Sequence, residues 1–151
     1  MKMMKICRGG HIILPTQNYI VLEPVLNDLM LEFLYKTRQL GVDKMADGSY
    51  VIDKHTADYV QGLVRMAMAD VRSGNKPAGY NDSEATYRLI FPICEGNIAF
   101  YVEATTSSTI ITDVTKSLSE LLTKHGIAHK VDWDSASMPA EKATTKPKRR
   151  R

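Results

Sequence analysis

His125 and His129 lie four residues apart, which is the spacing of a zinc-binding pair on one face of a helix. Gly126 between them predicts that the helix ends there, so the spacing loses its helical meaning. The two cysteines, Cys7 and Cys94, form no CxxC pattern. The sequence therefore predicts no metal site. One bridge between Cys7 and Cys94 is geometrically allowed, but a reduced, cytoplasmic setting is favoured.

The sequence offers little for catalysis. His55 and Asp58, three residues apart, have the residue types of an acid–base pair, but their position predicts the exposed first turn of a helix capped by Asp53 or Thr56. The motifs GxxxxGK[ST], GxGxxG, GxSxG and HExxH do not occur. We therefore expect no catalytic residue and no cofactor.

Charge is divided unevenly along the chain. The net charge of +3 combines a body, 1–141, of −3 with a tail of +6, so the basic pI belongs to the tail. From residue 135 the chain lacks aromatic and branched aliphatic side chains, which is typical of a disordered arm. The six tail cations are Lys142, Lys146, Lys148, Arg149, Arg150 and Arg151. We expect them to attach the protein to nucleic acid; a solubilising tail or a nuclear localisation signal are the alternatives.

The segment from Thr86 to Asp134 has the clearest pattern of the chain: strand, turn, strand, helix, strand. Residues 87–94 and 98–103 alternate as two strands, and Glu95-Gly96-Asn97 predicts a hairpin turn between them. Pro92 cannot donate a backbone hydrogen bond, so we expect the first strand at a sheet edge, or position 92 turned away from a partner strand.

One face of this hairpin is a candidate surface for nucleic acid. Exposed aromatic side chains on a sheet stack on the bases of single strands. Phe91 and Phe100 lie among aliphatic residues and are expected in the core, whereas Tyr101 shares a face with Glu103. The candidate contact residues of the body are Arg88, Tyr101 and Lys130.

Three amphipathic helices are expected, each ended by a glycine. The first begins near Pro24 and ends at Gly41, the second precedes Gly74, and the third spans about 108–125. In the N-terminal part, strands are expected at 2–7 and 11–14, separated by a turn at Arg8-Gly9-Gly10, and at 49–52. Residues 19–22 are expected as a strand or as a lead into the first helix.

Together these features predict an α+β fold in one small domain, 1–134, followed by the tail, 135–151. The antiparallel sheet, with the 87–103 hairpin at its centre, should pack against two or three helices. Neither a secretory signal nor a transmembrane segment is expected.

The function expected is that of a non-enzymatic accessory protein that binds RNA or single-stranded DNA through the tail, with help from the hairpin face. The alternative is a protein-binding adaptor, inhibitor or structural subunit that assembles through a sheet edge or a helix, as a homo-oligomer or with another protein. We expect a cytoplasmic location, or a nuclear one in a eukaryotic cell.

Overall fold

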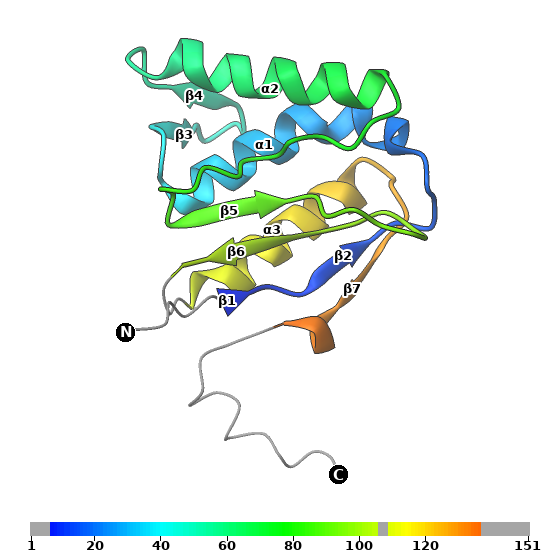
Figure 1. Cartoon of the computed structure of the whole chain (residues 1–151). Helices are drawn as coiled ribbons and strands as arrows, with labels where there is room; N and C mark the ends of the chain where they lie inside the picture. The colour runs from blue at the N-terminus through cyan, green and yellow to red at the C-terminus, as the bar shows by residue number, and fades with distance from the viewer. Residues whose placement is uncertain (1–6, 106–108, 137–151) are drawn as a thin grey trace.

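The computed structural model describes residues 7–105 and 109–136, and an antiparallel sheet lies at its centre (Figure 1). The strands of this sheet are β1 (Cys7–Arg8), β2 (His11–Ile13), β5 (Tyr87–Ile90), β6 (Ala99–Ala104) and β7 (Lys130–Asp132). β6 pairs with β5 on one side and with both β1 and β2 on the other, and β7 pairs with β2. The predicted sheet around the 87–103 hairpin is confirmed.

Helices α1 (Glu23–Thr37) and α3 (Ile110–Lys124) pack against each other and cover the same face of the sheet (Figure 1). Helix α2 (Ala57–Arg72) lies beyond α1, away from the sheet, together with the hairpin of β3 (Val42–Lys44) and β4 (Tyr50–Ile52). Two short 3-10 helices, η1 (Tyr19–Leu22) and η2 (Trp133–Ser135), precede α1 and follow β7. The predicted α+β architecture with three helices is confirmed.

The order of these elements defines the topology. If β1 and β2 count as one strand, the sheet and the two helices that cover it follow the order strand, helix, strand, strand, helix, strand. This is the split βαβ, or ferredoxin-like, arrangement. The β3–β4 hairpin and α2 form an insertion between α1 and β5. Such a topology is compatible with many functions, so the site must be argued from its residues.

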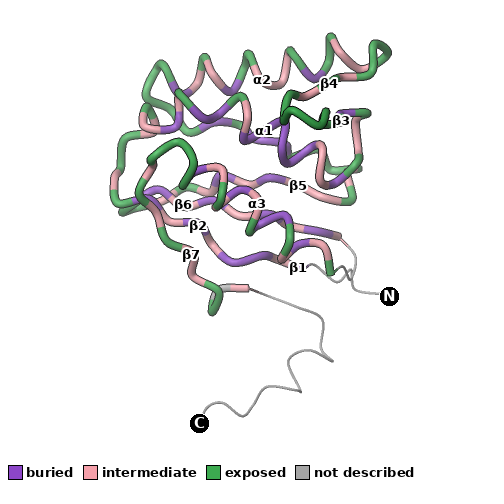
Figure 2. The backbone as a smooth tube through the Cα atoms, turned by 180° about the vertical axis from the view of Figure 1, so that it is seen from behind, coloured by how far each residue is buried: buried purple, intermediate pink, exposed green. Residues whose placement is uncertain are grey.

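The core lies between the covered face of the sheet and the two helices. Phe100 and Val102 of β6, which alternate with residues of the opposite face, have no accessible surface. Phe33 of α1 and Leu118 of α3 meet them from the helical side and are equally buried. Figure 2 shows α1 buried over most of its length, whereas few residues of α2 are buried and these recur along one side of the helix. The prediction that Phe100 and its neighbour Phe91 belong to the core is confirmed.

The ends of α1 and α3 show how local sequence sets their length. Pro24 lies in the first turn of α1, as predicted. The left-handed residue at its C-terminus is Arg38, with φ of 55°, and not Gly41, so the predicted glycine cap is wrong. At the end of α3, Gly126 adopts φ of 72° and Ile127 N–H donates to Leu122 O at 2.9 Å, which confirms the predicted ending.

One predicted strand is shorter, and residues 19–22 take the second of their two expected forms, a lead into the first helix. β5 ends at Ile90, ahead of Pro92, and the link to β6 leaves Ile93 86% exposed instead of on the buried face with Leu89. Residues 19–22 form a 3-10 helix, because the Asn18 side chain accepts a hydrogen bond from Ile20 N–H and caps it. Residues 2–6 of the first predicted strand lie outside the described residues.

A buried carboxylate attaches the β3–β4 hairpin to α1. Glu32 is 5% exposed and accepts hydrogen bonds from Lys44 Nζ at 2.8 Å and from the Tyr50 hydroxyl at 2.6 Å. Burial and the Glu32 carboxylate both raise the pKa of the Tyr50 hydroxyl far above its usual range. Tyr50 is therefore a permanent donor to Glu32.

The outer edge of β5 is closed by two different partners. Tyr80 exchanges two backbone hydrogen bonds with Leu89. Gln39 exchanges two more with Tyr87 through its side-chain amide: Oε1 accepts from Tyr87 N–H at 2.9 Å and Nε2 donates to Tyr87 O at 3.1 Å. This edge of the sheet is thereby protected against pairing with another chain.

Within the described part of the chain, no helix combines the length and the apolar character needed to cross a bilayer.

Candidate nucleic-acid interface

A bulge at Gly9 and Gly10 builds the face of the sheet opposite the helices. Arg8 pairs with Glu103, but Ile12 pairs with Phe100, so both glycines lie opposite the single residue Val102. Gly9 N–H still donates to Val102 O at 2.8 Å. The predicted turn is therefore wrong: the glycines form a β-bulge inside one line of strand, β1–β2, that runs along β6.

The bulge decides which side chains share a face. Arg8 and His11 are three positions apart and would point to opposite faces of a regular strand. The extra residue returns them to the same face, beside Tyr101. We call this surface the open face, because no described helix packs on it. Its polar and aromatic residues are Arg8, His11, Arg88, Tyr101, Glu103, Lys130 and Asp132.

Both glycines are required by close contacts. A Cβ atom on Gly9 would lie 2.4 Å from Thr115 Oγ1 and 2.9 Å from Ile111 Cγ2, both on α3. A Cβ atom on Gly10 would lie 3.0 Å from Asp132 O and from Trp133 Cε3. The two positions of the bulge therefore require glycine, because α3 and η2 pack too closely against them to leave room for side chains.

The centre of the open face is a stack of His11, Tyr101 and Arg8. The His11 and Tyr101 rings lie 4.7 Å apart with 12° between their planes, and the Arg8 guanidinium carbon lies 4.8 Å from the Tyr101 ring centre. Burial and the Arg8 charge lower the pKa of His11, and only Asp132 opposes them. At neutral pH the stack therefore carries the single charge of Arg8.

Arg88 lies next to this stack but is engaged with a carboxylate. Its Nε is 3.3 Å from Glu103 Oε1, and the two side chains are 15% and 13% exposed. Glu103 lies opposite both Arg88 and Arg8, so one carboxylate separates two guanidinium groups across three strands. Arg88 is the one cation of the hairpin itself, and Arg8 of β1 adds a second guanidinium group to this face.

Lys130 is the third predicted contact residue. It lies on the edge strand β7, opposite Ile13, and is exposed. The structure thus brings Arg88, Tyr101 and Lys130 onto one face, but in different rows: Arg88 beside Glu103, Tyr101 beside His11 and Lys130 beside Ile13. The six tail cations, Lys142, Lys146, Lys148, Arg149, Arg150 and Arg151, lie outside the described residues.

Sequence reasoning missed Arg8 and His11. A Gly-Gly pair ordinarily indicates the end of a strand, although the residues on either side of this pair suggest continuity. Cys7 and Ile12 are five positions apart, and both have no accessible surface. Two apolar strand ends at an odd spacing around a Gly-Gly pair are the signal of a bulge that could have identified this face.

The two histidines of the C-terminal region, His125 and His129, make local hydrogen bonds within the fold. His129 Nδ1 lies 2.9 Å from Ile127 O and so carries the proton, and Nε2 accepts from the Ser119 hydroxyl at 2.6 Å. His125 Nδ1 lies 3.0 Å from Leu121 O. No group of three His, Cys, Asp or Glu side chains in the described ranges is arranged to hold a metal ion, and Cys7 and Cys94 are both free.

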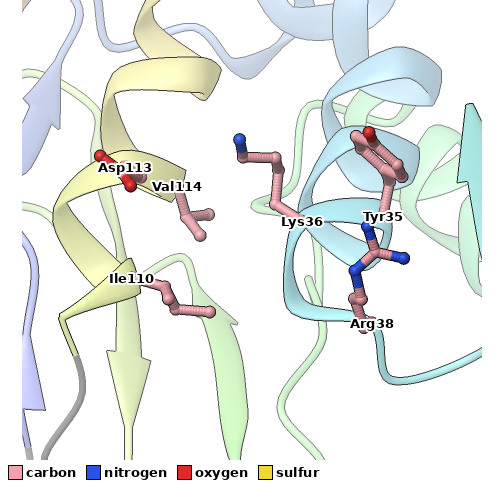
Figure 3. Close-up of a pocket in the computed structure, with 6 residues that line it drawn as sticks. All are labelled: Tyr35, Lys36, Arg38, Ile110, Asp113 and Val114. Carbon is pink, nitrogen blue, oxygen red and sulfur yellow. The ribbon is translucent and has the colours of Figure 1, made fainter.

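Away from the open face, a hollow of about 220 Å³ lies between the end of α1 and the start of α3. Figure 3 shows Ile110 and Val114 pointing from α3 toward α1, with Lys36 between the two helices. The Arg38 guanidinium at its rim lies 5.6 Å from the Tyr35 ring centre and pairs loosely with Asp43 at 3.7 Å. Arg38 is exposed and Lys36 is half-buried, and no second ring among the described residues stacks on Tyr35 as His11 stacks on Tyr101.

Comparison with known protein families, curated proteins and solved structures finds no match for this chain.

Proposed function

We propose that the chain is a non-enzymatic accessory protein that binds RNA or single-stranded DNA. The observation that carries this proposal is the bulge, which gathers Arg8 and His11 beside Tyr101 on a sheet face that no described helix covers. Arg88 and Lys130 lie on the same face. The basic tail, from Lys142 to Arg151, supplies the larger share of the positive charge.

The open face has the chemistry for bases more than for phosphates. Aromatic rings and guanidinium planes stack on unpaired bases irrespective of sequence. Glu103 and Asp132 offset most of the charge of Arg8, Arg88 and Lys130, so the face by itself attracts phosphates weakly. A division of labour follows, in which the tail binds the backbone and the open face contacts bases.

Fluorescence anisotropy with labelled single strands tests both parts. If all six tail cations contact phosphates, the logarithm of the association constant should fall with the logarithm of salt concentration at a slope of about −4. Deleting residues 141–151 should remove most of this slope. RNA, single-stranded DNA and duplex of one sequence should be compared, with the single strands preferred.

The open face is tested by Tyr101→Ala, which should weaken binding by about 1–3 kcal/mol with an unchanged salt slope. Ile93→Ala, in the exposed link between β5 and β6, is the matched control and should leave affinity unchanged. Affinity that is unaltered by both the tail deletion and Tyr101→Ala would refute the proposal.

The alternative function, assembly with a protein partner, draws support from one observation. Tyr80 and Gln39 close the β5 edge, but the outer side of α2 carries large exposed apolar residues. A cytoplasmic location, or a nuclear one in a eukaryotic cell, suits either function and remains a proposal.

A further inference from the structure

The outward side of α2 has an unusual composition for a solvent-facing helix. The residues opposite its buried stripe are Asp58, Tyr59, Gly62, Arg65, Met66 and Ala69, and we call them the α2 face. They recur at intervals of three and four, so they form one continuous strip along the helix. Tyr59 is 50% exposed and Met66 is 59% exposed, so the fold leaves two large apolar side chains in water.

Gly62 lies in the middle of this strip and has no role in the packing of the described residues. Glycine disfavours a helix relative to alanine. A Cβ atom on Gly62 would meet no atom within 4 Å, so nothing in the described part of the chain requires a missing side chain there. Small residues such as Gly62 and Ala69 on an outward face allow a second helix to approach closely.

Further apolar surface adjoins the α2 face. Val51 of β4 is 47% exposed, and a groove of about 310 Å³ separates α2 from α1 and β4. Leu31, Ile52, Val60 and Val64 are among the residues that line it. Arg65 of the α2 face also lines this groove, so the groove adjoins the α2 face along that flank of the helix.

The charges of the α2 face identify the partner. Asp58 lies near the N-terminus of α2 and Arg65 two turns later, and neither has an ion-pair partner among residues 7–105 and 109–136. When two copies of α2 cross antiparallel at Gly62, Asp58 of each copy reaches Arg65 of the other. The same arrangement brings Tyr59 against Arg65 of the second copy, where a cation–π contact forms. A strip that complements itself in this way suits a two-fold interface.

We infer that the α2 face is a homodimer interface, in which the α2 helices of two copies pack antiparallel with Gly62 at the crossing point. The occupant is a second copy of this chain, because the strip carries both members of the charge pair. This inference is independent of the open face, which lies on the opposite side of the sheet from α1 and α2.

Sedimentation equilibrium of the full chain over a range of concentrations tests the inference. The wild type should approach twice the 16.9 kDa of one chain as concentration rises. Asp58→Arg or Arg65→Asp alone places like charges together twice per dimer and should weaken association about tenfold or more. The double variant Asp58→Arg/Arg65→Asp restores both pairs and should recover association close to the wild-type value.

Two further variants separate the interface from folding. Gly62→Gln should leave the circular dichroism spectrum of the monomer intact and slightly raise its thermal transition, because the side chain has open space and glutamine favours a helix more than glycine, yet it should weaken the dimer by about tenfold. Lys116→Asp, an equally exposed charge reversal on α3, should leave association unchanged.

A wild-type chain that stays monomeric at every concentration, or a double variant no better than the singles, would overturn the inference. A monomer that captures a different protein through the α2 face would overturn the assignment of a second copy. If the Gly62→Gln variant dimerises as strongly as the wild type, the assignment of Gly62 as the crossing point would be overturned.

Discussion

The ring of His11 lies nearly parallel to the ring of Tyr101, with 4.7 Å between centroids, on two strands that the bulge brings into register. The protonation state of His11 should therefore affect how firmly the Tyr101 ring is held in the stack. A neutral imidazole stacks on the phenol ring beside the Arg8 guanidinium, whereas an imidazolium would place a second cation next to Arg8.

The pKa of His11 should lie below the ordinary value of 6.5, because the ring is partly buried and the Arg8 charge is close. Arg8→Gln should raise this pKa toward 6.5, and Asp132→Asn should lower it further, since Asp132 stabilises the charged ring. An NMR titration of the His11 ring protons measures both changes. A pKa above 6.5 in the wild type would contradict the geometry of the stack.

The same shift links His11 to folding stability. Between its folded pKa and 6.5 the unfolded chain binds more protons at this residue than the folded chain does. The His11 contribution to the free energy of unfolding is therefore complete above pH 6.5 and is lost as the pH falls toward the folded pKa. Urea unfolding of the wild type and His11→Phe through this window should show the smaller pH dependence in the variant.

Glu103→Gln should strengthen nucleic-acid binding. The substitution removes the carboxylate that lies 3.3 Å from Arg88 and opposite Arg8, so two guanidinium groups become available. The salt slope should steepen by about 0.7 for each further phosphate that these groups neutralise on a single strand. Anisotropy titrations at several salt concentrations measure it, with Glu120→Gln on the exposed side of α3 as control. Weaker binding would indicate that Glu103 itself contacts the ligand.

Gly9→Ala should destabilise the protein by about 1–3 kcal/mol, because its Cβ atom would overlap Thr115 Oγ1 at 2.4 Å. Thr115→Ala removes that oxygen and should recover part of the loss in the double variant, although Ile111 remains close. Urea denaturation of the four proteins in this cycle gives the coupling energy. If the two changes in the free energy of unfolding simply add, Gly9 and Thr115 do not interact and the bulge is not in contact with α3.

The Thr115 hydroxyl is fully buried and has no hydrogen-bond partner among the described residues. Thr115→Val keeps the shape of the side chain and removes the oxygen, so it should leave stability unchanged or raise it by about 1 kcal/mol. A marked loss of stability on denaturation would reveal an unrecognised partner for the hydroxyl.

Loss of the Tyr50 hydroxyl should destabilise the protein through the β3–β4 hairpin. Tyr50→Phe removes a hydrogen bond of 2.6 Å to a buried carboxylate and should cost about 1.5–3 kcal/mol. Arg72→Gln, which breaks the exposed pair with Glu23, should cost at most about 1 kcal/mol and serves as control. Hydrogen exchange of β3 and β4 amides should increase in Tyr50→Phe, and equal costs for both variants would contradict the buried role of Glu32.

Much of the fold follows from local pattern. The alternation in β6 and the amphipathic stripe of α3, with its Gly126 ending, predicted their buried faces correctly. The sequence predicted less well where the outcome depends on a distant partner. Arg38, and not Gly41, is the left-handed residue that ends α1. Gly41 also has a left-handed backbone, with φ of 69°, and a Cβ atom there would lie 2.8 Å from Asp53 Cβ, so a glycine is needed just ahead of β3.

The candidate site was only partly predictable for a similar reason. Tyr101 and Lys130 could be assigned to a face because each lies in a regular strand. Arg8 and His11 depend on a shift in register that becomes visible only when β6 is known to pair with both β1 and β2. The partner of Arg88 did not follow from the predicted hairpin, because a turn at residues 95–97 would place Arg88 opposite Ala104, whereas the longer link in the structure places it opposite Glu103.

The two hydrogen bonds between the Gln39 side chain and Tyr87 join points that are 48 residues apart in the chain. They close the insertion at its base, where α1 has ended and β5 begins. The entropic cost of closing this loop grows only slowly with its length, so additional residues between Gln39 and Tyr87 have little effect on the sheet. Surface loops of the insertion can therefore lengthen while the split βαβ arrangement stays the same, whereas its buried residues Val60, Val71 and Tyr80 tie the insertion to the core.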